Sequence, residues 1–343
     1  MSAMDHDGLT LMWLQLGGCG GCSMAFLGAE DPGLDDLRAA GIDILWHPSL
    51  SLANGRDFHA LLDAIESGGR RLDILCVEGA VVTGPAGTGR FHLLSGGDGR
   101  SMADVAKSLA GRARFVLAMG SCAAFGGITA AAPEYLEATG LMFDGATPGG
   151  ALGAHFVSAG GLPVVNVAGC APHPGWMTET LLALAAGELD IAGLDDLNRP
   201  LDIFAHLAHH GCGRNEFYEY KASAAALGQQ GCLMENLGCK GTRTAGDCNL
   251  REWNGGGGCI AGGYSCIACT SPEFERPGHA FLETPKIAGI PCGLPTDMPK
   301  AWFVALASLS KAATPRRLRV NAASDRIRAL PCPSGTTEEE DGK

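Results

Sequence analysis

Seven of the fourteen cysteines in this 343-residue chain are crowded into one stretch, residues 211–269. They are Cys212, Cys232, Cys239, Cys248, Cys259, Cys266 and Cys269. The stretch follows His209-His210 and ends with the pair Cys266-x-x-Cys269. Thiols at this density, mixed with glycine and few long apolar runs, indicate either a disulfide scaffold or a metal site.

The composition of the chain favours the metal site. It is 46% hydrophobic and 18% charged, which is typical of globular proteins, and no apolar run is long enough to span a membrane. Residues 1–8 are polar and no signal-peptide pattern is present, so we expect a cytoplasmic protein. Thiols stay reduced in the cytosol, where clustered cysteines favour metal over disulfides. The net charge of −12 argues against nucleic acid as a partner.

Four further cysteines follow predicted strands. Buried strands are predicted for the apolar runs at residues 9–16, 42–46, 72–77, 115–119 and 163–168. Helices are expected between or after these runs at residues 58–65, at 102–110 with Ser101 as a possible N-cap, and at 178–186. Strands that alternate with helices predict a parallel α/β sheet. Cys19 and Cys22 follow the first run, Cys122 the fourth and Cys170 the fifth. Because ligands of open α/β sheets bind beyond the carboxyl ends of the strands, these four thiols can converge on one centre.

Simpler roles exist for several residues in these motifs. A lone pair such as Cys19-x-x-Cys22 is also typical of thioredoxin-like redox sites and zinc half-sites. Glycines beside the four cysteines favour a bulky iron–sulfur centre, since they let backbone N–H groups approach its sulfurs. Cys76 lies inside an apolar run and is predicted to be a core thiol. The glycine-rich run at residues 84–89 lacks the Lys-Ser/Thr ending of a phosphate loop and is predicted to be an ordinary loop.

The motifs of this chain, taken together and in the order in which they occur, resemble those of the small, electron-transferring subunit of [NiFe] hydrogenases over roughly residues 9–275. The resemblance rests on Cys19-x-x-Cys22, Glu78-Gly79, Gly120-Ser121-Cys122-Ala123, Gly169-Cys170-x-Pro172-x-Pro174, His209-x-x-Cys212, Gly238-Cys239-Lys240-Gly241, Trp253-Asn254 and Cys266-x-x-Cys269. Residues 14–24 look most like the cytosolic hydrogen-sensing (regulatory) hydrogenases.

The resemblance implies an organisation for the whole chain. It implies a flavodoxin-like parallel-sheet domain at residues 1–195, which carries a proximal cluster. A loop-rich, mostly helical domain at residues 196–290 would carry a medial and a distal cluster, and residues 291–343 would form a C-terminal extension. The nickel–iron centre is expected in a separate large subunit, so this chain would conduct electrons and contribute no catalytic residue.

Carried over by motif, the resemblance implies two ligand sets of four residues. The proximal [4Fe–4S] cluster would be held by Cys19, Cys22, Cys122 and Cys170. The distal [4Fe–4S] cluster would be held by His209, Cys212, Cys232 and Cys239, with the H-x-x-C spacing favouring His209 over His210. The loop before Cys239 departs from the family pattern, because six residues separate it from Cys232, one more than expected. Glu78 resembles an acidic residue beside the proximal cluster, and a role in capping loop N–H groups is the alternative. Gly21 and Gly127 stand where oxygen-tolerant relatives carry two extra cysteines.

The medial set depends on Cys259. Cys248, Cys266 and Cys269 match the three thiolates of the common [3Fe–4S] site, in which a proline precedes the final pair by seven residues. Cys259 occupies that position here. Four thiolates complete a cubane, so we expect a medial [4Fe–4S] cluster held by Cys248, Cys259, Cys266 and Cys269. The alternative is a [3Fe–4S] cluster with Cys259 as a spare thiol. Cys76, Cys292 and Cys332 are assigned no chemistry.

The end of the chain is expected to contain a helix around residues 302–309, the basic run Arg316-Arg317-Leu318-Arg319, a short helix at 323–330 and a disordered acidic end at 336–343. Two roles are open for it: packing against the large subunit, or docking a signalling partner or a second heterodimer. The latter would give a dimer of heterodimers.

Two functions share the expected fold and clusters. The first is the small subunit of a hydrogen sensor that reports to a histidine kinase. The second is the small subunit of a cytosolic uptake hydrogenase that feeds electrons to respiration. A zinc-stapled structural protein is a third reading, and it predicts a colourless protein.

Overall fold

The computed structural model describes residues 8–96, 99–131, 134–251, 253, 256–276, 278–292, 294 and 299–323. The chain separates into two compact units, which are described in turn. Unit 1 comprises residues 1–207, 244–247 and 268–279, and unit 2 comprises 208–243, 248–267 and 280–343. The domain boundaries expected after residues 195 and 290 stay a prediction.

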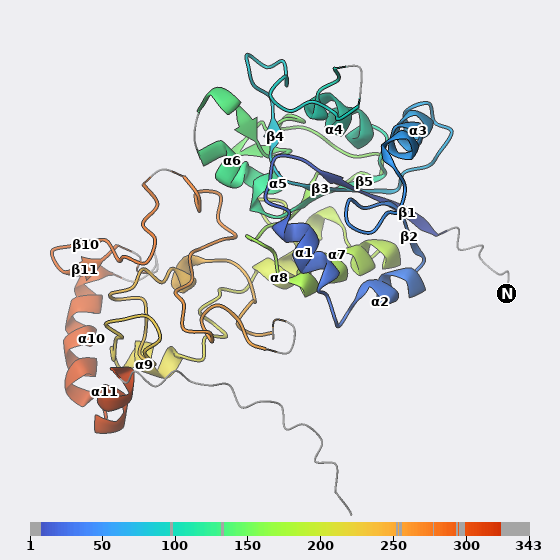
Figure 1. Ribbon diagram of the computed structural model, residues 1–343. Helices are drawn as coiled ribbons and strands as arrows, with labels where there is room; N and C mark the ends of the chain where they lie inside the picture. Colours follow the sequence, from blue (N-terminus) through green and yellow to red (C-terminus); the bar gives the residue numbers. More distant parts are fainter. Residues whose placement is uncertain are drawn as a thin grey trace, which may run out of the picture. The chain divides into compact units, whose positions relative to one another are not determined.

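Unit 1 is built on a five-stranded parallel sheet (Figure 1). Its strands are β1 (Leu9–Gln15), β2 (Ile42–Trp46), β3 (Ile74–Glu78), β5 (Phe115–Met119) and β9 (Val165–Val167). They are arranged in the order β2-β1-β3-β5-β9, all in parallel. This order has the switch point of flavodoxin-like sheets between β1 and β3, and it confirms the predicted fold class.

Helices cover both faces of the sheet, which makes its strands the core of the unit. α1 (Gly21–Leu27), α2 (Leu34–Ala39) and α7 (Pro174–Ala186) lie together on one face. α3 (Gly55–Glu66) and α4 (Met102–Ala110) lie on the other face (Figure 1). β3 and β5 are buried along their whole length, as expected for strands that are covered on both sides.

Smaller elements complete unit 1. They are β4 (Val81–Val82), α5 (Ser121–Phe125), α6 (Gly127–Ala131), η1 (Glu134–Leu136), β6 (Ala138–Thr139), β7 (Phe143–Asp144), β8 (Thr147–Pro148), η2 (Ile191–Gly193) and α8 (Leu201–Phe204).

Capping residues explain where two of the helices begin. α4 begins after Ser101, as predicted, because the Ser101 hydroxyl accepts the N–H of Asp104 at 3.1 Å. α7 was expected from residue 178 but begins four residues earlier, at Pro174. Proline is well suited to the first helical position, and the His173 imidazole caps the helix by accepting the N–H of Gly175 at 3.1 Å.

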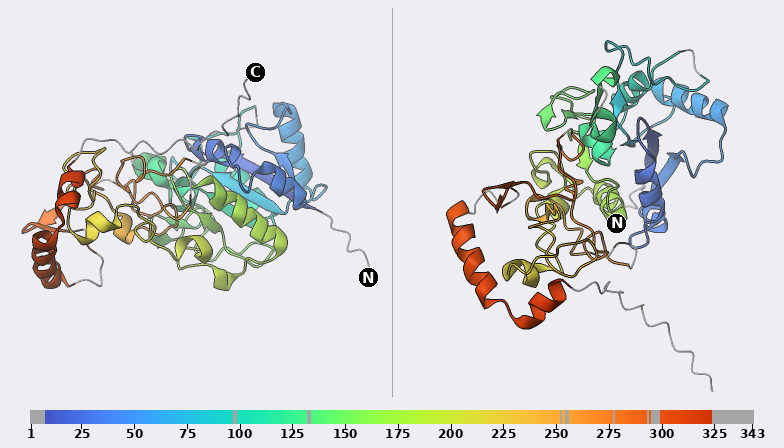
Figure 2. Two further views of the ribbon diagram at one scale, coloured as in Figure 1. Left: turned by 90° about the horizontal axis from the view of Figure 1, so that it is seen from below. Right: turned by 60° about the vertical axis from the view of Figure 1, so that its left-hand side comes forward.

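Unit 2 has little regular structure. It contains α9 (Asn215–Glu219), η3 (Gly241–Arg243), the hairpin of β10 (Lys286–Ile287) and β11 (Ile290–Pro291), α10 (Lys300–Ala313) and α11 (Arg316–Ala322). Figure 2 shows α10 as the longest helix of this unit, followed at once by α11. None of the helices formed by the described residues is both long and apolar enough to cross a bilayer.

One expectation for the end of the chain was wrong. The basic residues 316–319, expected between two helices, form the first turns of α11. Pro315 precedes them in an extended conformation as the N-cap residue of α11. Its ring prevents α10 from continuing, so a new helix begins after it. The structure does not describe residues 324–343. This range contains all but the first residue of the helix expected at 323–330, and also Cys332 and the acidic end at 336–343.

Candidate metal centres

The four thiols predicted for the proximal cluster all belong to unit 1. Cys19 follows β1 and Cys22 lies in the first turn of α1, while Cys122 lies in α5 directly after β5. Cys170 follows β9. The structure brings them together beyond the carboxyl ends of the strands. Burial raises the pKa of Cys22 far above its usual range, and the charges of Glu78, Cys122, Cys170 and Cys19 raise it further.

Burial also disfavours the thiolate form of two more of these cysteines. It raises the pKa of Cys122 to about 11 and that of Cys170 to about 12, with the Glu275 carboxylate adding to both shifts. Thiolates that gather in one partly buried site need a cation to offset their charge, so the group has the chemistry of a metal site.

Glycines let the backbone pass directly against these sulfurs. A methyl group built on Gly120 would lie only 2.4 Å from Sγ of Cys22, and one on Gly127 would lie 2.6 Å from Sγ of Cys122. Both glycines have a positive φ, +92° and +52°, which other residues rarely adopt. A methyl group on Gly21 would lie 3.2 Å from Sγ of Cys19. The two glycines expected to flank the proximal site, Gly21 and Gly127, therefore do line these thiols.

Glu78 connects the sheet to the thiol-bearing helix α1. It is the last residue of β3, its side chain is buried, and its carboxylate accepts four hydrogen bonds. Oε1 accepts the backbone N–H groups of Cys22 (2.9 Å) and Ser23 (3.1 Å). Oε2 accepts the indole N–H of Trp13 (3.0 Å) and the hydroxyl of Ser23. The capping role is therefore visible in the hydrogen bonds, and the same carboxylate stands beside the proximal thiols.

A second carboxylate, Glu275, was not found from the sequence. Its Oε1 accepts the thiol of Cys170 at 3.7 Å, and its Oε2 is buried without a hydrogen-bond partner among the described residues. That oxygen faces the same Gly127 position as Cys122, because a methyl group there would lie 2.8 Å from it. Burial raises the pKa of Glu275, which the Cys170 thiol opposes. No local motif marks Glu275, because it is 105 residues from Cys170 in the chain.

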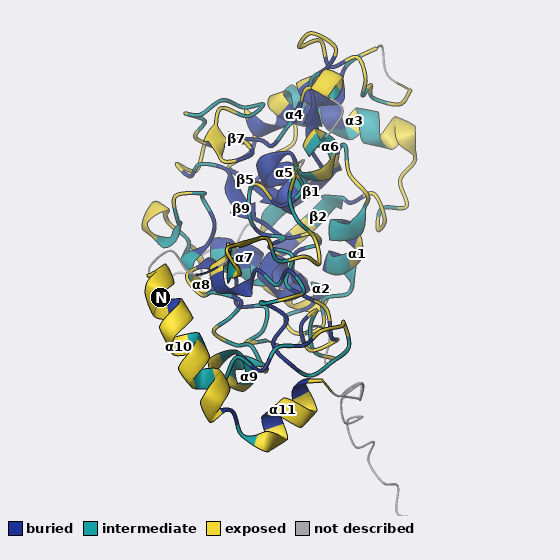
Figure 3. Ribbon diagram, turned by 90° about the vertical axis from the view of Figure 1, so that its left-hand side faces the viewer, coloured by how far each residue is buried: buried dark blue, intermediate teal, exposed yellow. Residues whose placement is uncertain are grey.

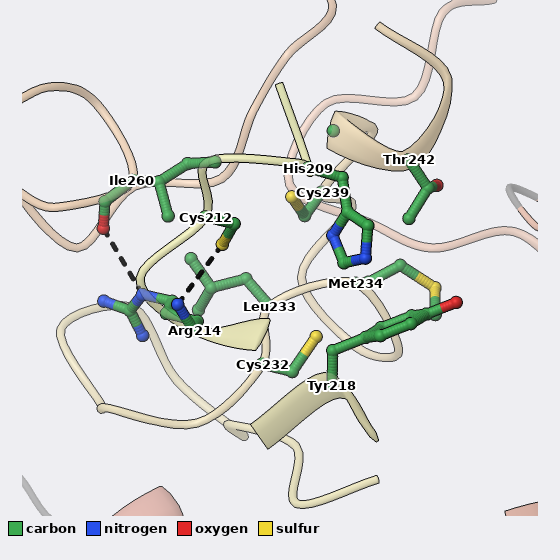
Figure 4. A pocket seen from close by; sticks show the side chains of 11 residues that line it. His209, Cys212, Arg214, Tyr218, Cys232, Leu233, Met234, Cys239, Thr242 and Ile260 are labelled. Carbon is green, nitrogen blue, oxygen red and sulfur yellow. Dashed lines mark hydrogen bonds between the residues drawn. The ribbon is translucent and has the colours of Figure 1, made fainter. Parts of the chain in front are cut away.

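The four residues predicted for the distal cluster line one pocket of unit 2, about 350 Å³ including space open to solvent. Figure 4 shows His209, Cys212, Cys232 and Cys239 around this pocket. His209 is a lining residue and His210 is not, which agrees with the H-x-x-C spacing. Three sulfurs and one imidazole around a single pocket suit a cluster with mixed thiolate and nitrogen ligands.

Backbone hydrogen bonds hold these residues in place. The N–H of Cys212 donates to the carbonyl of His209 at 3.1 Å, so the H-x-x-C segment is a tight turn. The N–H of Cys232 donates to the carbonyl of Ala222 at 3.0 Å. The six residues between Cys232 and Cys239 include a helical turn, in which the N–H of Leu237 donates to the carbonyl of Leu233 at 3.0 Å.

The distal pocket is partly desolvated, and a backbone N–H group and an aromatic ring contact two of its proposed ligands. Burial raises the pKa of Cys232 to about 12 and also raises the pKa of Cys212. The backbone N–H of Arg214 donates to Sγ of Cys212 at 3.4 Å (Figure 4). The ring of Tyr218 meets the His209 imidazole edge to face, with 4.5 Å between the ring centroids.

The medial assignment stays a prediction. Cys248, Cys259 and Cys266 belong to unit 2 and Cys269 belongs to unit 1. Of the cysteines that were assigned no chemistry, Cys76 is fully buried in β3, as predicted for a core thiol, and Cys292 is exposed.

Within the described ranges, no three His, Cys, Asp or Glu side chains are close enough to share a single metal ion. A four-iron cluster takes its ligands on different irons, and so does not need them to meet at one point.

The chain is similar to known proteins along most of its length. Residues 19–184 match the family described as the 20 kDa subunit of NADH ubiquinone oxidoreductase, and residues 204–282 match the C-terminal region of NiFe/NiFeSe hydrogenase small subunits. The chain is 31% identical to the periplasmic [NiFeSe] hydrogenase small subunit of Desulfomicrobium baculatum, over 79% of this chain and 86% of that protein. It is 29% identical to the F420 non-reducing hydrogenase II small subunit of Methanosarcina mazei, over 84% and 80%.

Solved structures add the same relationship at the level of the fold. The actinobacterial-type NiFe hydrogenase of Ralstonia eutropha H16 matches with a TM-score of 0.74 and 27% identity, covering 90% of this chain and 92% of that one. The recombinant [NiFeSe] hydrogenase of Desulfovibrio vulgaris Hildenborough matches with a TM-score of 0.66 and 29% identity, covering 80% and 98%. Similarity of this extent across both units shows common descent, and the chain therefore belongs to the family of nickel–iron hydrogenase small subunits.

Proposed function

We propose that this chain relays electrons from hydrogen oxidation at a nickel–iron centre, held by a large subunit, through three iron–sulfur clusters. The observation that carries the proposal is the pairing of two sites: four converging thiols in unit 1 and a pocket of three thiols and one imidazole in unit 2. Family membership supplies the expected partner, so the working unit would be a heterodimer.

The proposed ligands fit clusters of the [4Fe–4S] type. Such clusters, when bound, supply one-electron transfer at potentials set by charge and hydrogen bonding. Cys19, Cys22, Cys122 and Cys170 would hold the proximal cluster, and Glu78 would hold α1 against it. Gly120 passes close to Cys22 and has no side chain there. Backbone alone therefore borders this sulfur, which leaves room for a bulky inorganic group.

The distal and medial sites complete the proposed relay. His209, Cys212, Cys232 and Cys239 would hold the distal cluster, and the neutral imidazole would raise its potential relative to four thiolates. Cys248, Cys259, Cys266 and Cys269 would hold a medial [4Fe–4S] cluster; without Cys259 a [3Fe–4S] cluster is expected.

We further propose that the complex is a cytoplasmic hydrogen sensor that signals to a histidine kinase. The sequence of residues 14–24, which looks most like that of the hydrogen-sensing hydrogenases, supports this role. The alternative, a cytosolic uptake hydrogenase, is favoured by the name of a relative, the quinone-reactive Ni/Fe-hydrogenase small chain of Wolinella succinogenes, which is 30% identical.

Copurification from an anaerobic native extract tests these proposals. We expect a brown complex with a large subunit, nickel, and about twelve iron atoms on this chain, four for each cluster. A colourless zinc protein would refute the relay. Slow dye reduction with hydrogen and a copurifying kinase would support the sensor, whereas rapid dye reduction without a kinase would support the uptake enzyme.

A further inference from the structure

Lys221 is held between two aromatic rings of unit 2, beside the distal pocket. Its ammonium lies 3.9 Å from the ring centroid of Tyr218 and 5.2 Å from that of Phe303. A cation over aromatic faces is stabilised by the ring quadrupoles, most strongly when water is excluded. Lys221 forms no ion pair with a carboxylate among the described residues. The two rings therefore hold a positive charge at this position.

Tyr218 connects this charge to a proposed ligand of the distal cluster. The Lys221 ammonium lies over the Tyr218 ring. The same ring packs against the His209 imidazole, with 4.5 Å between the two ring centroids. Both Tyr218 and His209 line the distal pocket (Figure 4). A charge whose surroundings are packed rings is screened far less than a charge in water.

The C-terminal helix α10 supplies the other side of the clamp. Phe303 is 8% exposed and packs in one buried cluster with Cys232 and Met234, so α10 covers the proposed ligand Cys232. The helix is fixed there by an ion pair between Lys311 and Glu235 at 2.9 Å. Figure 3 shows the rest of α10 as largely exposed. The C-terminal extension therefore helps to build the distal site.

The charged side chains near the two sites differ. Carboxylates stand beside the proximal thiols: Glu78 is buried and accepts the backbone N–H of Cys22, and the half-buried Glu275 accepts the thiol of Cys170. Near the distal pocket, positive charge comes from Lys221 and from the lining residue Arg214, whose guanidinium donates to the carbonyls of Ile260 and Gly231. Two carboxylates are also near: Glu219, and Glu235, which is paired with Lys311. A nearby positive charge stabilises the reduced, more negative form of a redox centre, and a negative charge opposes it.

We propose that Lys221 is a positioning residue that acts through Tyr218 to raise the reduction potential of the distal cluster. The inference rests on the proposed distal ligands. Its consequence is a downhill path for electrons that leave the proximal site, which favours hydrogen oxidation over hydrogen production. No atom is transferred to or from Lys221, since its role is to place a charge.

Redox titration of the purified hydrogenase complex, followed by EPR, tests this role. Lys221→Met keeps the apolar stem and removes the charge, so the distal midpoint potential should shift downward while the proximal potential stays unchanged. Lys221→Arg keeps the charge over the rings, so the distal midpoint potential should stay close to the wild-type value. Lys286→Met is the matched control, because Lys286 is an exposed lysine of the same unit whose charge water screens.

An unchanged distal potential in Lys221→Met, with the cluster still present, would overturn the inference. If Lys221→Met fails to assemble the cluster, Phe303→Leu removes one ring of the clamp and should give a smaller downward shift; no shift there would equally overturn it. A wild-type complex without a histidine-ligated distal cluster would instead refute the proposed function on which the inference rests.

Discussion

Replacing Glu78 with glutamine should destabilise unit 1 by removing an acceptor that four donors share. Oε1 accepts the amides of Cys22 and Ser23, and Oε2 accepts the Trp13 indole and the Ser23 hydroxyl. Glutamine keeps one oxygen and replaces the other with an NH2 group. With its oxygen toward the two amides, the NH2 group faces the indole N–H, and two donors then meet.

The magnitude follows from burial. Trp13 is fully buried, so its indole N–H would have no acceptor and no water. An unsatisfied buried donor costs about 1–3 kcal/mol, while the Ser23 hydroxyl can rotate and accept from the new NH2 group. The bonds that remain lose the strength that the negative charge gave them. We expect a total loss of about 2–3 kcal/mol, which is a decrease in Tm of roughly 4–12 °C for a domain of this size.

Thermal unfolding of the purified, cluster-containing protein measures this loss, and a double-mutant cycle assigns it. Trp13→Phe removes the indole N–H, so Glu78→Gln should cost less in that background. The coupling energy between the two changes should be about 1–2 kcal/mol, well above the 0.3–0.5 kcal/mol scatter of additive sites.

Additive effects, with a coupling below about 0.5 kcal/mol, would refute this reasoning. An unchanged Tm together with an altered proximal-cluster spectrum would do so as well. In that case Glu78 would act on the cluster alone, and its hydrogen bonds to α1 and Trp13 would contribute nothing measurable to stability.

Three further outcomes can be measured. Gly120→Ala should displace Cys22, because the new methyl group would lie 2.4 Å from its Sγ, with a loss of up to about four iron atoms per chain; Gly87→Ala, at a φ of +71° with no atom within 4 Å, should keep its iron and separates crowding from backbone strain. Cys259→Ser should produce a [3Fe–4S] EPR signal in the oxidised protein, and the same signal in undamaged wild-type protein would contradict a four-thiolate medial cluster. Burial lowers the pKa of His47 to about 4, against an ordinary 6.5, with the Glu78 charge opposing that shift; native stability should therefore fall by at most about 3 kcal/mol as pH drops from 6.5 toward 4. His47→Phe should lose less Tm than the wild type over that range, and parallel decreases would contradict this.

Much of the fold could be predicted because its signals are local. Continuous apolar runs predict β1 and β5 almost to the residue, since strands covered on both faces need apolar side chains throughout. The fifth strand is shorter than its apolar run and ends at Val167, because only three residues pair with β5. The early start of α7 depended on His173, whose ring acts as an N-cap that composition does not indicate.

The sequence alone determined which cysteines to propose as ligands of the proximal and distal clusters, because each lies in a short motif next to a turn or a strand end. The H-x-x-C turn at His209 and the strand-end position of Cys122 follow from spacing and from the geometry of parallel sheets. Only the tertiary structure decided which charges surround those sulfurs. Glu275 reaches Cys170 from 105 residues away, and Lys221 is clamped by Phe303 of the C-terminal helix. Electrostatic effects depend on distance and burial, which long-range packing sets and no local pattern records.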